Sequence, residues 1–245
     1  YIEPLLPIGE RLVAKIADPA DAQLRQGLYQ TTLGVLSEAY LALVLTDPRH
    51  PRFVPYGGQE IFNIQATNPD YMYSLARVED EGVYRISGYR GTSHSVLFQI
   101  GGGNWIPRGE LSEKGPDNLN YGPVFANFEL DDVHIGKDGA FEFMLSRERP
   151  KDYIGDWQKL SAGSTHILLR RTACDWVHEA DARIAIQRMD QAPMRPRPSA
   201  EEIAANLKRL AEFTEHHVAR SINQADLFRK QVPANTFGFI TFDGG

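Results

Sequence analysis

Apolar residues near both ends of the chain recur at helical spacing. Residues 18–21 (DPAD) are typical of a helix start, and the apolar spacing continues from Ala22 to about Asp47-Pro48. Ser199 and Glu202 form a capping-box pattern, which predicts the start of a second helix. The apolar stripe of that second helix consists of Ile203, Leu207, Leu210, Phe213 and Val218. We therefore predict a helix toward each end, packed by one face on a common core.

The centre of the chain shows short runs that are typical of β-strands. The predicted strands are residues 71–78, 83–89, 93–100, 125–130, 141–145 and 166–171, separated by turn residues. Residues 182–188 fit a further strand or the end of a helix, and the strand is favoured. Within residues 84–87 polar and apolar side chains alternate, as expected for a strand with one buried face. The pattern predicts an α+β protein with an antiparallel, jelly-roll-like β-sandwich core and helices packed on it.

The domain organisation follows from this order of elements. A chain of 245 residues with a β-rich centre is expected to form a single domain. We predict a helical leader over residues 1–50, the β-sandwich core over 51–190, and a linker, a helix and the start of a further strand over 191–245. Residues 237–242 (FGFITF) have strand composition but lack a partner strand, so we expect a further C-terminal piece.

Charge and composition exclude some classes of protein. The 26 Lys and Arg residues against 32 Asp and Glu give a net charge of −6 without a basic block, so a nucleic-acid partner is not expected. The longest apolar run, residues 39–45, is much shorter than the ~20 residues that span a bilayer, so no membrane partner is expected either. The single cysteine, Cys174, favours a reducing compartment such as the cytoplasm. Because the sequence begins at Tyr1, a trimmed N-terminal signal stays an alternative.

Five short motifs occur in a fixed order along the central region. They are residues 67–73 (TNPDYMY), 83–91 (VYRISGYRG), 138–145 (DGAFEFML), 156–157 (DW) and 169–176 (LRRTACDW). Over residues 60–190 this series resembles the bacterial family called domain of unknown function 1214, whose members often carry an upstream domain of unknown function 1254 or a helical leader. The resemblance implies a β-sandwich core and further strands beyond residue 245. It supplies no established reaction, but many relatives occur in bacteria that degrade apolar aromatic, terpenoid or steroid compounds, which favours small-molecule chemistry.

Two turns carry side chains suited to acid–base chemistry. Asn68 and Asp70 flank a proline before a strand and could aim polar groups into a cleft near Tyr73, although such residues also stabilise turns through their own backbone. Around a second turn, Arg90 could bind a carboxylate while His94 exchanges a proton. Strand alternation with Val96 and Phe98 would place His94 inward; the alternative is a solvated hairpin turn.

Further candidates lie at a strand end and on a glycine-rich segment. By strand alternation, one of Arg170 and Arg171 must face the core, either in an ion pair with Asp175 or as a clamp for a substrate carboxylate. Trp105 follows three glycines and could close as a lid over an apolar ligand, or simply fold onto the surface. Cys174 is favoured as a small packed residue over a nucleophile.

The histidines lack the usual zinc-ligand spacing and the chain has no nucleotide-binding fingerprint, so neither a metal nor a cofactor is predicted. A metal held by residues of distant strands, with His166 among them, stays an alternative. The leading hypothesis is an enzyme that acts on a small, largely apolar compound with a carbonyl or carboxylate group by lyase, isomerase or hydrolase chemistry. Arg90 and Arg170 or Arg171 would bind the anionic group, Asp70 or His94 would move the proton, and Tyr73 would stabilise an oxyanion. The alternatives are a non-catalytic carrier of an apolar ligand and a scaffold for assembly; a homo-oligomer fits any of them.

Overall fold

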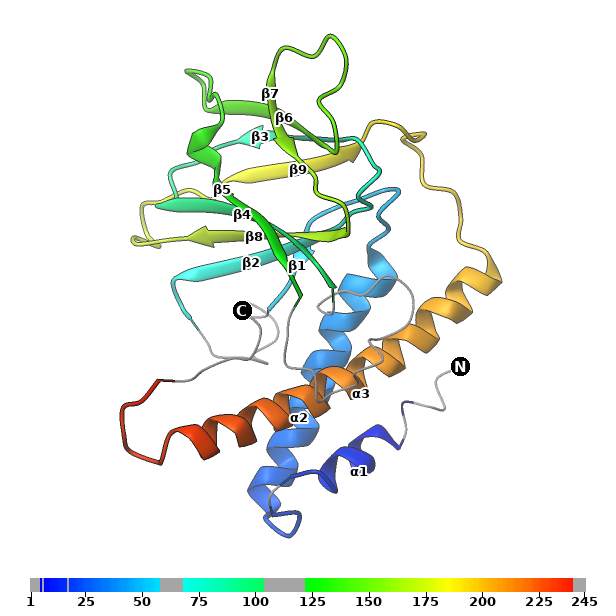
Figure 1. Cartoon of the computed structure of the whole chain (residues 1–245), viewed down its shortest axis with the longest axis vertical. Helices are drawn as coiled ribbons and strands as arrows, with labels where there is room; N and C mark the ends of the chain where they lie inside the picture. Colours follow the sequence, from blue (N-terminus) through cyan, green and yellow to red (C-terminus); the bar gives the residue numbers. More distant parts are fainter. Residues whose placement is uncertain (1–4, 6, 17, 58–67, 104–121, 240–245) are drawn as a thin grey trace.

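The computed structural model describes residues 5, 7–16, 18–57, 68–103 and 122–239, and it separates into a β-rich half and a helical half (Figure 1). The helices are α1 (Ile8–Val13), α2 (Ala22–Ala39), the π-helix η2 (Tyr40–Leu45), the short 3-10 helix η5 (Leu130–Asp132) and α3 (Ala200–Gln231). The strands are β1 (Val54–Pro55), β2 (Tyr71–Arg77), β3 (Tyr84–Tyr89), β4 (Ser95–Gly102), β5 (Val124–Glu129), β6 (Ala140–Ser146), β7 (Asp156–Lys159), β8 (Ser164–Thr172) and β9 (Arg183–Arg188).

The strands form two sheets that pack face to face. One sheet has the order β1-β2-β8-β4-β5 and the other has the order β7-β6-β3-β9. Aromatic side chains from both sheets meet in the core between them: Phe98 of β4 lies 5.2 Å from Phe128 of β5 and 5.5 Å from Phe143 of β6, centroid to centroid. The predicted α+β fold with a two-sheet core and packed helices is confirmed.

The pairing departs from the expected antiparallel pattern at one edge. Strand β7 runs parallel to β6, with Phe143 opposite Asp156 and Ser146 opposite Lys159. The chain reaches that edge through residues 147–155, which carry it back to Phe143, in the middle of β6, before β7 begins. A connection that returns to the same end of a strand gives parallel pairing, whereas a tight hairpin gives antiparallel pairing.

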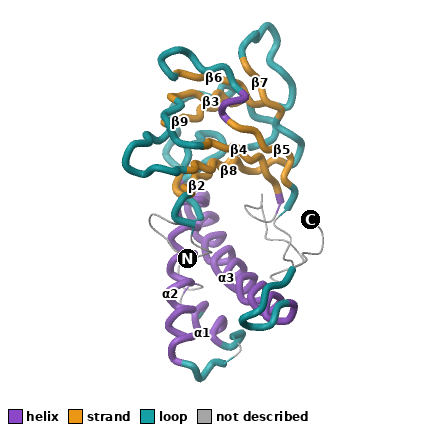
Figure 2. The backbone as a smooth tube through the Cα atoms, turned by 90° about the vertical axis from the view of Figure 1, so that its left-hand side faces the viewer, coloured by secondary structure: helices purple, strands orange, loops and turns teal. Residues whose placement is uncertain are grey.

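The five-stranded sheet is buried on both faces. Ile167 and Leu169 of β8 enter the core between the sheets, while Leu168 between them joins a second apolar cluster with the helices. Such two-sided burial explains why the centre of β8, residues 167–169, is apolar at three successive positions rather than alternating. Figure 2 shows the helices gathered on one side of the sandwich, with β2, β8 and β4 next to them.

The helices begin where their caps predict. The Asp21 carboxylate accepts hydrogen bonds from the backbone of Gln23 and Leu24 at the start of α2. Ser199 and Glu202 form the predicted capping box of α3. Toward the middle of α3, Glu215 forms a bidentate ion pair with Arg11 of α1, with N–O distances of 2.7 and 2.6 Å. The last of these contacts joins α1 to α3.

Several local expectations need correction. Gly101 and Gly102 lie inside β4 and do not form a loop, because strand pairing with β8 continues past a bulge between them. Ile203 is 48% exposed and is not part of the buried stripe of α3, since it lies in the first turn. Phe237 and Phe239 are exposed and lie outside any strand, and the rest of the predicted terminal strand falls outside the described residues.

Helix α2 and η2 together bear on the expected absence of a membrane span. By length and composition alone, the helical run Ala22–Leu45 could cross a membrane, although a core helix or a signal sequence meets the same criteria. This run is longer than the apolar stretch of residues 39–45, because scattered small and polar residues do not interrupt the helix. A cytoplasmic location without membrane contact therefore stays a prediction, as does a homo-oligomer.

Candidate functional site

Asn68 and Asp70 stabilise a turn. The Asn68 Oδ1 atom accepts a hydrogen bond from the Asp70 backbone N–H at 3.1 Å, and the Tyr71 N–H donates to the Asn68 carbonyl at 3.2 Å. The Asp70 side chain is exposed to solvent. The structure thus shows the turn alternative for these two residues and brings neither of them against Tyr73 through a hydrogen bond.

Arg90 and His94 do not form the expected substrate-binding turn. The Arg90 guanidinium forms a bidentate ion pair with Asp131 at 2.6 and 3.1 Å and donates to the Ser93 carbonyl at 2.8 Å. His94 is exposed, so the expectation that it points inward is wrong. Its parity with Val96 does not apply, because β4 begins only at Ser95. Arg90 therefore joins the turn to η5 and is not free to hold a substrate.

Arg171 faces the sandwich, but its acidic partner is not Asp175. Its guanidinium lies 3.4 Å from the Asp181 carboxylate and 3.4 Å from the Ser74 hydroxyl. Asp175 instead bonds the His178 imidazole at 2.7 Å and the backbone of a local turn. A side chain that caps its own turn has no remaining freedom to reach back to the strand, which explains why the predicted pair does not form.

Arg170 lies on the opposite face of β8, toward the helices. It pairs with Tyr73 of β2 in the strand register, and its guanidinium carbon lies 5.9 Å from the centroid of the Tyr73 ring. Its Nη2 atom donates to the Gln99 Oε1 atom of β4 at 2.7 Å. The Arg170 Nε atom is buried and has no hydrogen-bond partner among the described residues. The structure thus brings two of the predicted residues, Tyr73 and Arg170, into contact.

Glu38 of α2 reaches the same layer from the helical side. Its side chain is only 2% exposed, its Oε1 atom accepts from the Gly57 backbone N–H at 3.0 Å, and Oε2 has no partner within the described part of the chain. Gly57 lies next to Tyr73, because a Cβ added to Gly57 would be 3.7 Å from Cγ of Tyr73. The Glu38 carboxyl is therefore connected to the Tyr73 ring through Gly57. Burial raises the pKa of Glu38 to about 7, because water no longer stabilises the carboxylate.

Two buried histidines belong to the same sheet–helix layer. His166 of β8 lies over Gly101, where an added Cβ would come within 2.6 Å of its Nε2 atom. Burial lowers the pKa of His166 to about 4. His217 of α3 stacks near Phe213 at 5.3 Å, and burial together with the charge of Arg220 lowers its pKa to about 3. Both imidazoles are therefore neutral at pH 7.

These observations define a helix-facing cluster that consists of Glu38, Tyr73, Gln99 and Arg170. His166 lies outside it, because it is four residues, or ~13 Å, from Arg170 along β8. The sequence hypothesis includes Tyr73 and Arg170 but misses Glu38 and Gln99. Glu38 carries a recognisable signal, since it is an acidic residue among the buried apolar residues Val35 and Ala39 of α2 and Ala42 of η2. Trp105, the predicted lid, lies outside the described residues.

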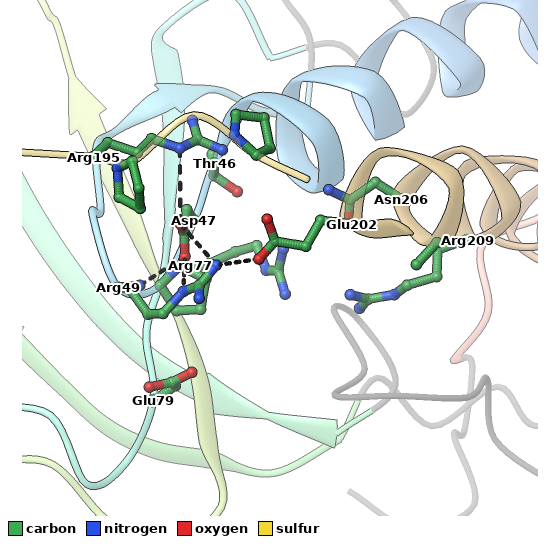
Figure 3. A pocket seen from close by; sticks show the side chains of 13 residues that line it. Thr46, Asp47, Arg49, Arg77, Glu79, Arg195, Glu202, Asn206 and Arg209 are labelled. Atoms are coloured by element: carbon green, nitrogen blue, oxygen red, sulfur yellow. Dashed lines mark hydrogen bonds and ion pairs between the residues drawn. The ribbon is translucent and has the colours of Figure 1, made fainter. Parts of the chain in front are cut away.

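A separate feature is a polar pocket where α3 meets the sandwich. Its volume is about 290 Å³, and Figure 3 shows that Glu202, Asn206 and Arg209 enter it from α3. On the opposite wall Asp47 binds Arg49 and Arg195, and Arg49 also binds Glu202 at 3.0 Å. Within the described residues, no three histidine, cysteine or acidic side chains are grouped so that they could hold a metal ion.

The comparisons with known proteins support the architecture. No family model and no curated protein matches the chain. A crystal structure of an uncharacterized protein from Burkholderia cenocepacia is similar with a TM-score of 0.76 at 24% sequence identity, over 95% of this chain and 59% of that chain. The VPA0106 protein from Vibrio parahaemolyticus has a TM-score of 0.31 at 12% identity, over 55% and 33% of the two chains.

The likeness to the Burkholderia protein concerns the fold alone, and this chain spans about three-fifths of that protein's length. The class of molecule that emerges is an α+β protein with a two-sheet core and a helix layer on one sheet. Membership of the family called domain of unknown function 1214 stays a prediction.

Proposed function

We propose that the chain is an enzyme that acts on a small, largely apolar compound bearing a carbonyl or carboxylate group, by acid–base chemistry at the helix-facing cluster. The observation that carries this proposal is the presence of two buried polar atoms, Glu38 Oε2 and Arg170 Nε, without partners among the described residues. A buried polar group without a partner costs about 1–3 kcal/mol and calls for an explanation, such as a role in binding or catalysis.

Arg170 would bind the oxygen of the substrate. Gln99 anchors one end of the guanidinium and the Tyr73 ring packs against it, so the group is held in place before a ligand arrives. The Nε–H remains available to donate a charge-assisted hydrogen bond to a carbonyl or carboxylate oxygen. Of the two arginines that the sequence offers for this role, only Arg170 is proposed, since Arg171 faces the sandwich and binds Asp181.

Glu38 would move the proton. A carboxyl with a pKa of about 7 exists in both protonation states at neutral pH, so it can accept a proton from a substrate and return it. Asp70 and His94, the acid–base residues of the sequence hypothesis, are exposed and lie outside the cluster. Tyr73 packs against Arg170 and next to Gly57, whose backbone N–H binds Glu38, and its hydroxyl would stabilise a developing oxyanion.

The surroundings suit an apolar substrate. The cluster is embedded in an apolar layer to which Leu43 of η2, Leu75 of β2 and Leu168 of β8 belong. These apolar side chains would contact the carbon skeleton of the substrate while the polar groups bind its oxygen. The chemistry would be of the lyase, isomerase or hydrolase type, and the described residues supply acid–base groups for it without a bound cofactor.

The test begins with ligand binding. A panel of apolar carboxylic acids, ketones and esters would be screened by thermal shift against the wild type, Arg170→Gln and Arg171→Gln. A ligand at 100-fold its Kd stabilises the fold by about 2.7 kcal/mol. We expect Arg170→Gln to lose the shift, while Arg171→Gln, the matched control on the opposite face of β8, keeps it.

Turnover of the compounds that bind would then be measured with Glu38→Gln. We expect this variant to retain binding and lose turnover, because an amide cannot accept the proton. Ligand binding without turnover by the wild type would replace the enzyme with the carrier alternative. If no compound shifts the melting temperature, or if Arg170→Gln shifts like the wild type, the proposed site is wrong.

A further inference from the structure

Six arginines surround two adjoining pockets at the joint between the helix layer and the sandwich. The first pocket has a volume of about 290 Å³ and the second of about 330 Å³, and they share Arg49 and Arg195 in their walls. The arginines of the two pockets together are Arg49, Arg52, Arg77, Arg188, Arg195 and Arg209. They come from the segment after η2, from β2, β9 and α3, and from the linker before α3.

The local charge of these pockets opposes that of the chain. Three carboxylates, Asp47, Glu79 and Glu202, line the first pocket, and no acidic residue lines the second. Asp190, outside the pocket walls, also pairs with Arg188, so six guanidinium groups against four carboxylates leave a local charge of +2 in a chain whose net charge is −6. An ion-pair network that served only to join two layers would be expected to balance, so the excess positive charge favours an anionic ligand.

The ion pairs hold the guanidiniums but do not use all of their donors. Arg49 contacts Asp47 and Glu202 through Nε and Nη2, and Arg195 contacts Asp47 through Nε at 3.7 Å and the Leu45 carbonyl through Nη1 at 3.4 Å. Each guanidinium carries five N–H donors, so at least one terminal amino group of each arginine stays available. Both arginines line the shared wall, from which these groups can reach either pocket.

The wall formed by α3 adds two further groups. Arg209 and Asn206 project into the first pocket from the same side of the helix (Figure 3). Burial lowers the pKa of Arg209, because less water surrounds its charge, while the nearby Glu212 carboxylate acts in the opposite direction. The Asn206 amide could add a donor beside it.

We propose that these two pockets form a binding site for a small polar oxyanion, with the ligand's phosphate or carboxylate oxygens held by Arg49, Arg195 and Arg209. Arginine forks match paired oxygens better than lysine does, and no lysine lines either pocket. Volumes near 300 Å³ fit a compact ligand. The pocket residues are separate from the helix-facing cluster, so this site is a second one and does not depend on the proposed enzymatic function.

A bound anion would act on the joint between the layers. Its partners would include Arg209 in the helix layer, Arg195 in the linker and Arg49 after η2, so one ligand would bridge three segments. Such a ligand stabilises the arrangement in which all three segments are close together.

The test is equilibrium dialysis of the full chain against labelled inorganic phosphate and, separately, labelled succinate, at low ionic strength. The variants are Arg195→Gln, Glu202→Gln and the control Arg197→Gln, an exposed linker arginine outside both pockets. We expect Arg195→Gln to raise the Kd at least about tenfold, as the loss of a charge-assisted hydrogen bond does, and Arg197→Gln to leave it unchanged.

Glu202→Gln supplies a test that misfolding cannot imitate. It removes a negative charge from the wall and releases Arg49, while glutamine still serves the capping box, so we expect tighter anion binding. Binding of phosphate alone would identify a phosphate-type ligand, and binding of succinate alone a carboxylate. The proposal is overturned if neither anion binds, or if Arg195→Gln and Arg197→Gln bind equally. Arg170→Gln should bind both anions normally, which separates this site from the proposed enzymatic one.

Discussion

Replacement of Glu38 by glutamine should change the pH dependence of stability in a defined direction. The pKa of this carboxyl is raised from 4.5 to about 7 in the fold, because the side chain is 2% exposed. Between these two values the folded chain holds a proton that the unfolded chain has released. The free energy of unfolding therefore falls as the pH rises from about 4.5 to about 7 and is level above it.

The size of the effect follows from the same two values. A difference of 2.5 pH units between 4.5 and about 7, at ~1.36 kcal/mol per unit, amounts to about 3 kcal/mol. His166 acts in the opposite direction, since its pKa falls from 6.5 to about 4 and its contribution is lost as the pH falls through that range. The two trends oppose each other in the wild type, so the wild-type curve alone cannot isolate Glu38.

The contribution of Glu38 is isolated by the difference in stability between Glu38→Gln and the wild type. Glutamine keeps the acceptor for the Gly57 N–H but has no ionisable group, so the histidine contributions cancel in the comparison of Glu38→Gln with the wild type. Urea denaturation at a series of values from about pH 5 to about pH 9 would give the stability of each protein. Between about pH 5 and about pH 9, the free energy of unfolding of the variant should rise by about 3 kcal/mol relative to that of the wild type. This change does not depend on the stability difference between the two proteins at about pH 5.

A matched control is Glu212→Gln on α3, whose side chain is 42% exposed. This variant makes the same change from a carboxyl to an amide at an exposed position, so it controls for the change of functional group itself. A stability difference between Glu38→Gln and the wild type that stays constant across the series would show that Glu38 is not a buried protonated carboxyl, and it would remove the proposed proton carrier.

The remaining predictions concern the scaffold. Arg90→Ala should lower stability by about 1 kcal/mol without affecting ligand binding, because it breaks a pair whose Asp131 side chain is 58% exposed; denaturation and thermal shift would check both. Phe98→Ala should cost about 3–5 kcal/mol in urea denaturation, since this fully buried ring touches aromatic rings of both sheets, and a loss under 1 kcal/mol would contradict the core described. Gly101→Ala should displace the His166 ring, an effect that would appear as a changed imidazole NMR signal, whereas Gly27→Ala, which meets no atom within 4 Å, should leave that signal in place.

The sequence carried most of the fold because its local signals were strong. Capping residues located the starts of α2 and α3, and β-branched and aromatic runs located the longer strands. The short strands β1 and β7 were not predicted, since two and four residues are too few to show a periodicity. Strand β1 even contains Pro55, which argues against a strand unless it lies at a sheet edge, as it does here.

The candidate site was less predictable because it depends on pairing between distant segments. Alternation showed that Arg170 and Arg171 face opposite ways, but only the register with β2 shows which one meets Tyr73. Glu38 and Gly57 come from different elements, and no local pattern announces the hydrogen bond between them. The prediction for His94 was wrong for a simpler reason. The strand begins at Ser95 and not at Ser93, so His94 lies before it and strand parity does not apply to it.

The position of β8 has a consequence for how the chain folds during synthesis. Its two neighbours, β2 and β4, precede it by many residues in the sequence. Tyr73 pairs with Arg170, which is synthesised 97 residues later. In the folded sheet β8 lies between β2 and β4. Until residue 172 has left the ribosome, both strands lack this hydrogen-bonding partner, and their apolar side chains stay uncovered. Pairing over such distances along the chain is slow, and exposed strand edges promote aggregation. The nascent chain should therefore depend on chaperones over this interval, and truncations before β8 should be insoluble.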